Sequence, residues 1–354
     1  MSSLETAAAD IVRSWDWSGP VGLRRVPEGL INATFTVEVE GRFEAVLQRL
    51  NTAVFGPEVN QDIEAVTARL AERGVLTPRL LRTRRDALWA STADGDVWRC
   101  LTAVGERTLD SLSSPLQARS AGQLAARFHV ALADLEWEFR SVRPGFQDTA
   151  RHLANLGQAL AEHGQHRLFP AVARLADVLA VARQGWSGVA ALPPRVVHGD
   201  LKVSNLRFAG SEAMALIDLD TLARGTIDAE LGDALRSWCN PAGENVAEVA
   251  LDLELFEAAV GGYASGGGRE LLTEAEWASL VPGLERISLN LSARFAADAL
   301  QERYFGWDPA RGGRGEHNLL RARGQASLLG SIRRQRRQLE AALRRARTSV
   351  PTPP

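Results

Sequence analysis

The stretch VVHGDLKVSN, residues 196–205, begins with two valines. After them it carries a histidine, two ionisable side chains and an asparagine, namely His198, Asp200, Lys202 and Asn205. Thirteen residues after Asn205, Asp218 follows the apolar run MALI. Both segments are typical of short strands that end in polar loops. A turn whose Asp and Asn side chains bond their own backbone explains any one of these residues. It does not explain all five at this spacing.

These residue types fit the chemistry of phosphoryl transfer. Asp200 offers a carboxylate that can align or deprotonate a hydroxyl, and Lys202 offers a cation for the γ-phosphate. Asn205 and Asp218 offer hard oxygen ligands for Mg²⁺, which usually takes one or two from the protein and the rest from phosphates and water. Asp220 is either a second carboxylate on the metal side or a cap for the loop.

HGDLKVSN resembles the protein-kinase catalytic loop H-R-D-L-K-x-x-N, and LIDLD lies where that family has the metal-binding D-F-G. Gly after His, together with Ile-Asp-x-Asp, resembles the aminoglycoside/choline kinase-like phosphotransferase family. This resemblance implies an ATP-dependent kinase of small molecules, with Asp200 acting on the acceptor hydroxyl and Asn205 and Asp218 binding Mg²⁺. It also implies that His198 buttresses the loop and that Asp233, in AELGDALRSW, hydrogen-bonds it.

The pattern along the chain predicts an α+β protein. TFTVEVEGRFEAVLQRL alternates apolar and polar residues around a turn at 40–41, which predicts a hairpin. EVNQDIEAVTARLAERG predicts a helix ending at Gly74, and residues 79–104 predict two or three more strands. From about Leu109 the chain is mainly helical. With the resemblance, this predicts a bilobal kinase-like fold, with a small antiparallel-sheet lobe that binds nucleotide (1–104) and a larger, mainly helical lobe (105–354) for catalysis and acceptor binding.

Composition excludes several other classes. The net charge of the 354 residues is −2, which argues against nucleic acid or a membrane surface as a partner. No stretch approaches the roughly 20 apolar residues of a membrane helix, and the opening stretch MSSLETAAADIVRSW has no apolar run of the length expected for export. The two cysteines lie far apart and match no metal spacing. We therefore expect a cytoplasmic, unanchored monomer or homodimer.

The nucleotide is expected to lie against the small lobe and the hinge. GLINATF, residues 29–35, lies between two predicted strands, where a loop that covers nucleotide belongs. Asn32 and Thr34 are the candidates for phosphate contacts, although an ordinary hairpin turn also explains the segment. The adenine is expected to bind backbone groups near Thr102 and Val104.

The strand VLQRLN, residues 46–51, occupies the place where protein kinases keep a phosphate-binding lysine, and it has none. Gln48 and Arg49 point to opposite faces of a strand, so only one of them faces ATP. Charge favours Arg49 and the alignment favours Gln48, so the choice stays open. Glu64 is a candidate partner on the following helix, although a solvated helix face explains it better.

Further stretches resemble the N-acetylhexosamine 1-kinases, a sugar-kinase branch of the same superfamily. These stretches are GLINATFTV (29–37), AVLQRLNTAVFGPE (45–58), ARFAADALQERYF (293–305) and GEHNLLRARGQ (315–325). The resemblance implies phosphorylation of the anomeric hydroxyl of a sugar, giving a sugar 1-phosphate, with Arg294 and Tyr304 touching the sugar.

In GFQDTARH, residues 145–152, Phe146 is a candidate for stacking on the sugar ring and Asp148 for binding its hydroxyls. Gln147 stands where the sugar kinases are expected to have His, which leaves the sugar open. The alternatives are another small acceptor, of the aminoglycoside, choline or homoserine type, and a nucleotide sensor without activity. A polycationic acceptor is disfavoured by Arg294, and a dead site by the intact Asp200, Asn205 and Asp218.

Overall fold

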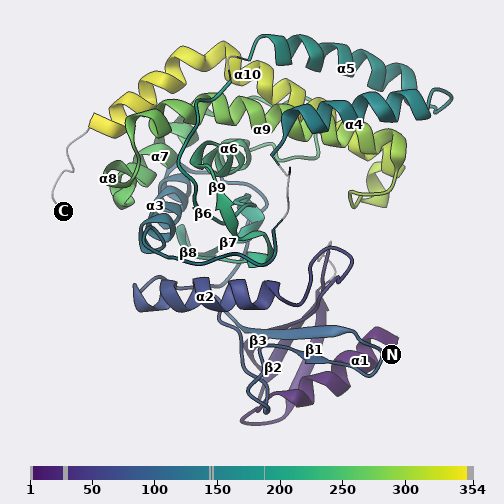
Figure 1. Cartoon of the computed structure of the whole chain (residues 1–354), viewed down its shortest axis with the longest axis vertical. Helices are drawn as coiled ribbons and strands as arrows, with labels where there is room; N and C mark the ends of the chain where they lie inside the picture. The colour runs from purple at the N-terminus through teal and green to yellow at the C-terminus, as the bar shows by residue number, and fades with distance from the viewer. Residues whose placement is uncertain (1–2, 27–30, 143–144, 146, 187, 349–354) are drawn as a thin grey trace.

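The computed structural model describes residues 3–26, 31–142, 145, 147–186 and 188–348, and Figure 1 shows a sheet-containing lobe beneath a larger helical lobe. The small lobe contains α1 (Ser3–Ile11), β1 (Val21–Val26), β2 (Ala33–Val39), β3 (Arg42–Arg49), α2 (Val59–Glu72), β4 (Ala90–Ser91) and β5 (Val97–Thr102). An antiparallel-sheet lobe is therefore confirmed. The predicted boundary at residues 104/105 stays a prediction, and it falls in the connection between β5 and α3.

The sheet has the order β1-β2-β3-β5-β4, and each pair of neighbours is antiparallel. The predicted hairpin is formed by β2 and β3. Its turn residues Glu40 and Gly41 both have positive φ (51° and 79°), as a two-residue hairpin turn requires. One face of the sheet packs on α1 around Trp15, Phe35 and Trp98, which are almost completely buried. The hydrophobic pattern of the first 100 residues thus builds its own small core.

Helix α2 lies between the sheet and the helical lobe (Figure 1). It matches the helix predicted to end at Gly74, and its buried Ile63 and Val66 belong to the same apolar cluster as Leu124 and Phe128 of the helical lobe. The buried carboxylate of Asp62 adds polar tethers. It accepts hydrogen bonds from Trp137 Nε1 (2.9 Å) and from the backbone N–H groups of Arg140 and Ser141. Helix α2 is therefore anchored to the large lobe by both apolar and polar contacts.

The large lobe is mainly helical, as expected. Its helices are α3 (Pro115–Ala131), α4 (Thr149–Glu162), α5 (Phe169–Gln184), α6 (Ile227–Trp238), α7 (Leu253–Tyr263), α8 (Arg269–Leu271), α9 (Glu274–Gln301) and α10 (Arg314–Thr348). Its strands are β6 (Arg195–Val197), β7 (Leu206–Ala209), β8 (Glu212–Leu216) and β9 (Ala223–Gly225), which pair as β6-β9 and β7-β8. The predicted strands near 195–220 are confirmed, and β7 and β9 are their partners.

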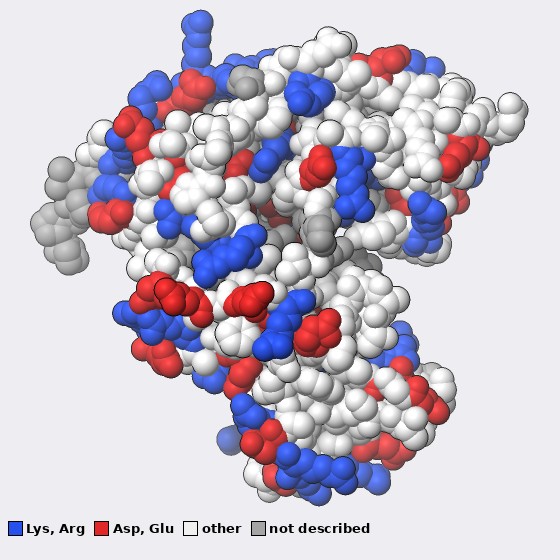
Figure 2. Space-filling view, in the orientation of Figure 1, with Lys and Arg blue, Asp and Glu red and all other residues white. Residues whose placement is uncertain are grey.

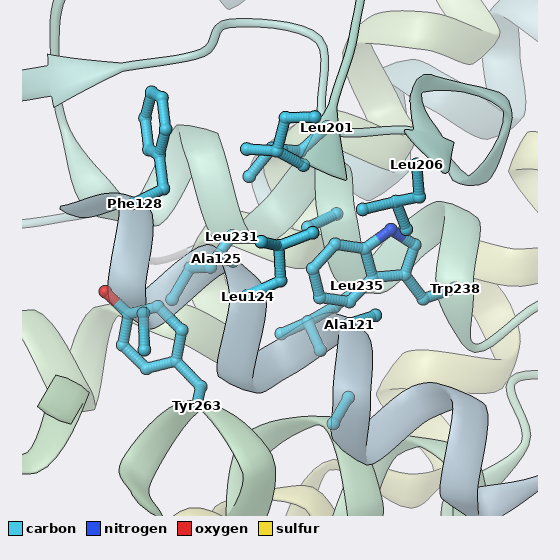
Figure 3. Packing of buried hydrophobic residues seen from close by; sticks show 14 of the residues in the cluster. Ala121, Leu124, Ala125, Phe128, Leu201, Leu206, Leu231, Leu235, Trp238 and Tyr263 are labelled. Atoms are coloured by element: carbon cyan, nitrogen blue, oxygen red, sulfur yellow. The ribbon is translucent and has the colours of Figure 1, made fainter. Parts of the chain in front are cut away.

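The apolar residues of the segment 196–206 anchor this segment in the core. Leu201 and Leu206 are fully buried, and Figure 3 shows them above side chains of α3 and α6, including Leu124 and Trp238. Apolar and polar residues alternate along this segment, so the leucines hold the backbone while the side chains of Asp200 and Lys202 remain partly exposed. The short strands and 3₁₀ turns here therefore position polar side chains and do not form an extended sheet.

Helices α4, α5, α9 and α10 pack around a second apolar cluster, which is separate from the core beneath the loop. In Figure 1 these helices form the upper layer of the large lobe. In the part of the chain that the structure describes, no helix combines the length and apolarity that crossing a bilayer requires.

Candidate active site

Asp200 is the centre of a hydrogen-bonded group of polar side chains. Lys202 Nζ lies 2.6 Å from Asp200 Oδ2, and Asn205 Nδ2 donates to the same oxygen at 3.0 Å and to the Asp200 carbonyl at 2.8 Å. The Asp200 side chain retains 29% of its exposure and the Lys202 side chain 36%. The structure thus brings together three of the predicted residues at a position that solvent reaches.

The charge on Asp200 is held in place by its neighbours. Burial opposes its ionisation, but the Lys202 ammonium and the Asn205 amide outweigh burial and lower the pKa of Asp200. Burial also acts to lower the pKa of Lys202, and the carboxylates of Asp200 and Asp218 reverse that and raise it. At neutral pH the site therefore contains a carboxylate and an ammonium in direct contact.

His198 buttresses the loop and is fully buried. Asp200 N donates to its Nδ1 (3.3 Å), and its Nε2 lies 2.9 Å from the carbonyl of Ile217. Both ring nitrogens therefore have partners in the backbone. Because Ile217 precedes Asp218, the ring joins the Asp200 loop to the loop that carries Asp218.

The glycine after His198 has a steric reason. Gly199 has φ +81°, and a Cβ there would lie 2.5 Å from the carbonyl oxygen of Thr221. Thr221 Oγ1 in turn donates to the carbonyl of His198 (2.8 Å). The two polar loops therefore touch through their backbones, an approach that a side chain at position 199 would block.

A residue that sequence reasoning missed, Glu230 of α6, holds the loop backbone. Its carboxylate is buried and accepts hydrogen bonds from His198 N (2.8 Å) and Gly199 N (2.9 Å), and it lies 3.2 Å from His129 Nε2. Asp233, which the family resemblance suggested for this task, pairs instead with Arg236 (2.8 Å). The two acids are three positions apart on α6, so only the packing of the helix decides which one meets the loop.

Asp218 occupies an unusual backbone conformation. Its φ of 64° and ψ of 57° are left-handed, and it immediately precedes the 3₁₀ turn Leu219–Thr221. Its side chain is exposed. Partial desolvation by the surrounding protein and the nearby Asp220 carboxylate raise the pKa of Asp218. A cation beside this carboxylate would relieve both effects.

The donor set here fits a hard divalent cation. Because Nδ2 of Asn205 is taken by Asp200, Oδ1 is the amide atom available to a metal, and it adds to the carboxylate of Asp218. Among the described residues, no three His, Cys, Asp or Glu side chains cluster as a metal site. Mg²⁺ bound on phosphates needs only one or two protein ligands, so Asn205 and Asp218 are a sufficient pair.

Asp220 has partners other than those expected for a metal ligand. Its buried carboxylate forms an ion pair with Arg99 of β5 and accepts a hydrogen bond from Asn32 Nδ2 (2.6 Å). Asn32 is therefore turned toward Asp220, and its Oδ1 accepts from Asn51 N (2.9 Å). Arg99 was missed because an arginine within a strand carries no local signal of function.

The structure gives Gln48 and Arg49 of β3 different partners. Gln48 accepts hydrogen bonds from Arg99 Nε (2.9 Å) and Nη2 (2.7 Å), and it donates to Thr34 Oγ1 (3.3 Å). Arg49 pairs with Asp96, with side chains 39% and 42% exposed. Gln48 is thus the residue on the Asp220 side of the strand.

Two further positions of the small lobe and hinge have protein partners. Glu64, considered as an ion-pair partner for this strand, pairs with Arg82 instead. At the expected hinge, Thr102 N donates to the carbonyl of Arg79, and the Thr102 hydroxyl oxygen accepts a hydrogen bond from Arg79 N. The carbonyl of Val104 accepts from Arg207 Nε (3.0 Å).

The acceptor candidates of the large lobe gather around α9. The guanidinium of Arg294 lies over the rings of Tyr304 (5.8 Å) and Phe305 (5.3 Å). Asn290, one turn earlier on the same helix, donates to the carbonyl of Gln147 (3.4 Å). Asp148 caps α4 through Arg151 N, and Phe146 lies outside the described residues.

The loop that carries Tyr304 is fixed by Asp298. This buried carboxylate accepts from the backbone N–H groups of Arg303, Tyr304 and Phe305 and from Asn318 Nδ2, at 2.8–3.0 Å.

Figure 2 shows the surface drawn in on one side between the lobes, with acidic and basic side chains interspersed over both. The face shown therefore carries no single field that would select a strongly charged partner.

Sequence comparison places the chain among phosphotransferases. The profile of the "Phosphotransferase enzyme family" (APH) matches residues 22–266. The homoserine kinase of Bradyrhizobium sp. (strain BTAi1 / ATCC BAA-1182) is 26% identical over 237 residues, which cover 65% of this chain and 68% of that protein. The homoserine kinase of Methylobacterium sp. (strain 4-46) is 27% identical over 244 residues, covering 66% and 70%.

Solved structures with the same fold cover nearly the whole chain. A microcompartment-associated aminopropanol kinase superposes with a TM-score of 0.61 at 18% identity, covering 96% of this chain and 99% of its own. The amicoumacin kinase hAmiN, in complex with AMP-PNP, Ca²⁺ and Ami, gives 0.62 at 10% identity, covering 96% and 94%. At these identities the likeness concerns the fold alone, and it confirms the expected bilobal kinase-like architecture.

Proposed function

Because the chain belongs to the phosphotransferase enzyme family APH, we propose that it is an ATP- and Mg²⁺-dependent kinase that phosphorylates a hydroxyl group of a small molecule. The first candidate acceptor is the anomeric hydroxyl of a sugar, an N-acetylhexosamine type, which gives a sugar 1-phosphate. The observation that carries the proposal is the contact of Asp200 with Lys202 and Asn205, beside the exposed Asp218.

Asp200 is the residue that acts on the acceptor. Its lowered pKa keeps it ionised, so it accepts a hydrogen bond from the acceptor hydroxyl and aligns the oxygen with the γ-phosphorus. The new O–P bond forms as the bond to ADP breaks, and the hydroxyl proton passes to Asp200 and then to solvent. Lys202 offsets the negative charge of the γ-phosphate beside Asp200. Asn205 and Asp218 would hold Mg²⁺, which supplies charge neutralisation on the phosphates.

The neighbourhood of Arg294 supports a sugar. A neutral polyol is recognised by planar hydrogen-bonding groups next to an aromatic surface. The planar guanidinium of Arg294 over the rings of Tyr304 and Phe305 supplies both. The same cation disfavours a polycationic aminoglycoside.

A second candidate is a hydroxy amino acid of the homoserine type. The curated relatives named above are homoserine kinases, and they match about two thirds of this chain. An α-carboxylate is a group that an arginine binds well through two parallel hydrogen bonds, so Arg294 suits this acceptor too. Both candidates share the same chemistry at Asp200.

The test is ADP release from Mg-ATP with GlcNAc, GalNAc, other free sugars, homoserine, choline and kanamycin, using Asp200→Asn as the blank. Asp200-dependent turnover of a reducing sugar, giving a product labile to mild acid, supports the sugar 1-kinase. Turnover of homoserine alone transfers the proposal to the second candidate. If no acceptor in this panel releases ADP above the blank, the kinase proposal is wrong for these acceptors.

A further inference from the structure

Arg99 and Asp220 form a buried ion pair between the two lobes. They are 121 positions apart, one on β5 and the other in the 3₁₀ turn after Asp218, and each side chain retains 2% exposure. Arg99 Nη2 donates to Asp220 Oδ2 at 2.9 Å, and Nη1 donates to Oδ1. With Gln48 and Asn32, which complete the hydrogen bonds of this pair, we call this group the interlobe clamp.

The clamp is well satisfied for a buried ion pair. Removing two ions from water is costly, and only good geometry with additional hydrogen bonds offsets that cost. Here the guanidinium fork meets both carboxylate oxygens, while Gln48 and Asn32 satisfy further donors and acceptors. The consequence is a rigid link, because neither partner can move away without leaving a buried charge.

The clamp replaces a pairing that the described residues of the small lobe do not make. Protein kinases join a strand lysine to a helix glutamate, and both must be in place for activity. Here Gln48 occupies the strand, and Glu64 of α2 binds Arg82 near the surface. The buried cation comes from β5, directly opposite Gln48 in the sheet register, and its partner carboxylate comes from the turn next to Asp218.

We propose that the interlobe clamp fixes the metal-side turn against the nucleotide lobe, which makes Arg99 and Asp220 positioning residues for Asp218. The proposal rests on the proposed function. Asp218 has a left-handed backbone that needs support from its surroundings. Thr221 is tied to His198 on one side of the turn, and Asp220 is tied to β5 on the other. Without the clamp the turn loses one of these two supports, and the carboxylate of Asp218 loses its fixed position.

The experiment compares ADP affinity with MgCl₂ and without it, by titration calorimetry. The variants are Arg99→Gln, Asp220→Asn and the double variant Arg99→Gln/Asp220→Asn, which leaves no unpaired buried charge and is therefore the safest to fold. We expect each to lose about tenfold or more of the gain in ADP affinity that Mg²⁺ provides, the usual effect of removing a residue that orients a metal ligand. Affinity for ADP alone should change less than threefold.

The matched control is Arg195→Gln/Glu276→Gln, which removes another bidentate ion pair with a fully buried carboxylate, one that joins β6 to α9 within the large lobe instead of joining the two lobes. It should unfold at a lower temperature yet keep the full Mg²⁺-dependent gain. If the folded clamp variant also keeps the gain, the clamp proposal is wrong while the proposed function stands. If the unmutated protein has no Mg²⁺-dependent gain, the metal site of the proposed function is itself wrong, and the clamp proposal fails with it.

Discussion

Replacing Glu230 by Gln tests whether α6 holds the catalytic loop through a carboxylate. Two backbone N–H groups, of His198 and Gly199, donate to its two oxygens. A glutamine keeps one acceptor and turns an NH₂ group toward the other donor. The lost charge-assisted bond and the unsatisfied buried N–H together suggest a loss of about 3 kcal/mol in the free energy of unfolding. Displacement of the loop by about 1 Å should lower kcat roughly 100-fold.

The direction of the Glu230 pKa shift predicts how its contribution to stability changes with pH. Burial opposes ionisation of Glu230, but His129 and the loop N–H of Gly199 outweigh it, so its folded-state pKa is lowered. The carboxylate therefore contributes stability above the unfolded pKa of about 4.3, and this contribution disappears as the pH falls through the folded pKa. The difference in stability between the unmutated protein and Glu230→Gln should be full at pH 7 and should shrink below that unfolded value.

Urea unfolding at pH 7 and at steps down to pH 3, with kcat at pH 7, measures both effects. Asp228→Asn is the control, because Asp228 is a buried acid of the same helix that pairs with Arg286 instead of the loop. It should lose stability but little kcat relative to Glu230→Gln. A Glu230→Gln enzyme with unchanged kcat, or a stability difference that is constant down to pH 3, would refute the reasoning.

Three other substitutions have defined outcomes. Asp200→Asn should lower kcat by about 10³-fold with the ADP dissociation constant within threefold of the unmutated value, measured by calorimetry; a comparable loss of ADP affinity would contradict its assignment to the acceptor. Asp298→Asn should loosen the Tyr304 loop, costing about 2 kcal/mol and raising the acceptor KM several-fold at constant ATP KM, and an equal rise in both would contradict it. Asp62→Asn should cost about 2–3 kcal/mol in urea unfolding and change Trp137 emission, and unchanged stability would show that the tether from α2 contributes nothing.

The sequence was sufficient to predict the local parts of the site. Asp200, Lys202 and Asn205 lie within six residues of one another, so the loop alone brings them together, and the structure places all three in contact. The predicted hairpin at 40–41 and the helix ending at Gly74 are also confirmed, because turn chemistry and periodicity are properties of short segments. The choice of acceptor is a property of a pocket built from several elements, and so it stays a proposal.

Only the tertiary structure decided which residues support the site. Which of Glu230 and Asp233 meets the loop depends on the rotation of α6 against its neighbours, which the three-residue spacing leaves open. Arg99 meets Asp220 across 121 positions, because the packing of α2 and the docking of the sheet bring β5 next to the turn Leu219–Thr221. A charge that has been removed from water is costly unless it has a partner, and this cost arises only where the folded core excludes water. Sequence spacing therefore determined the groups that we propose to react, and the folded core determined the groups that hold them.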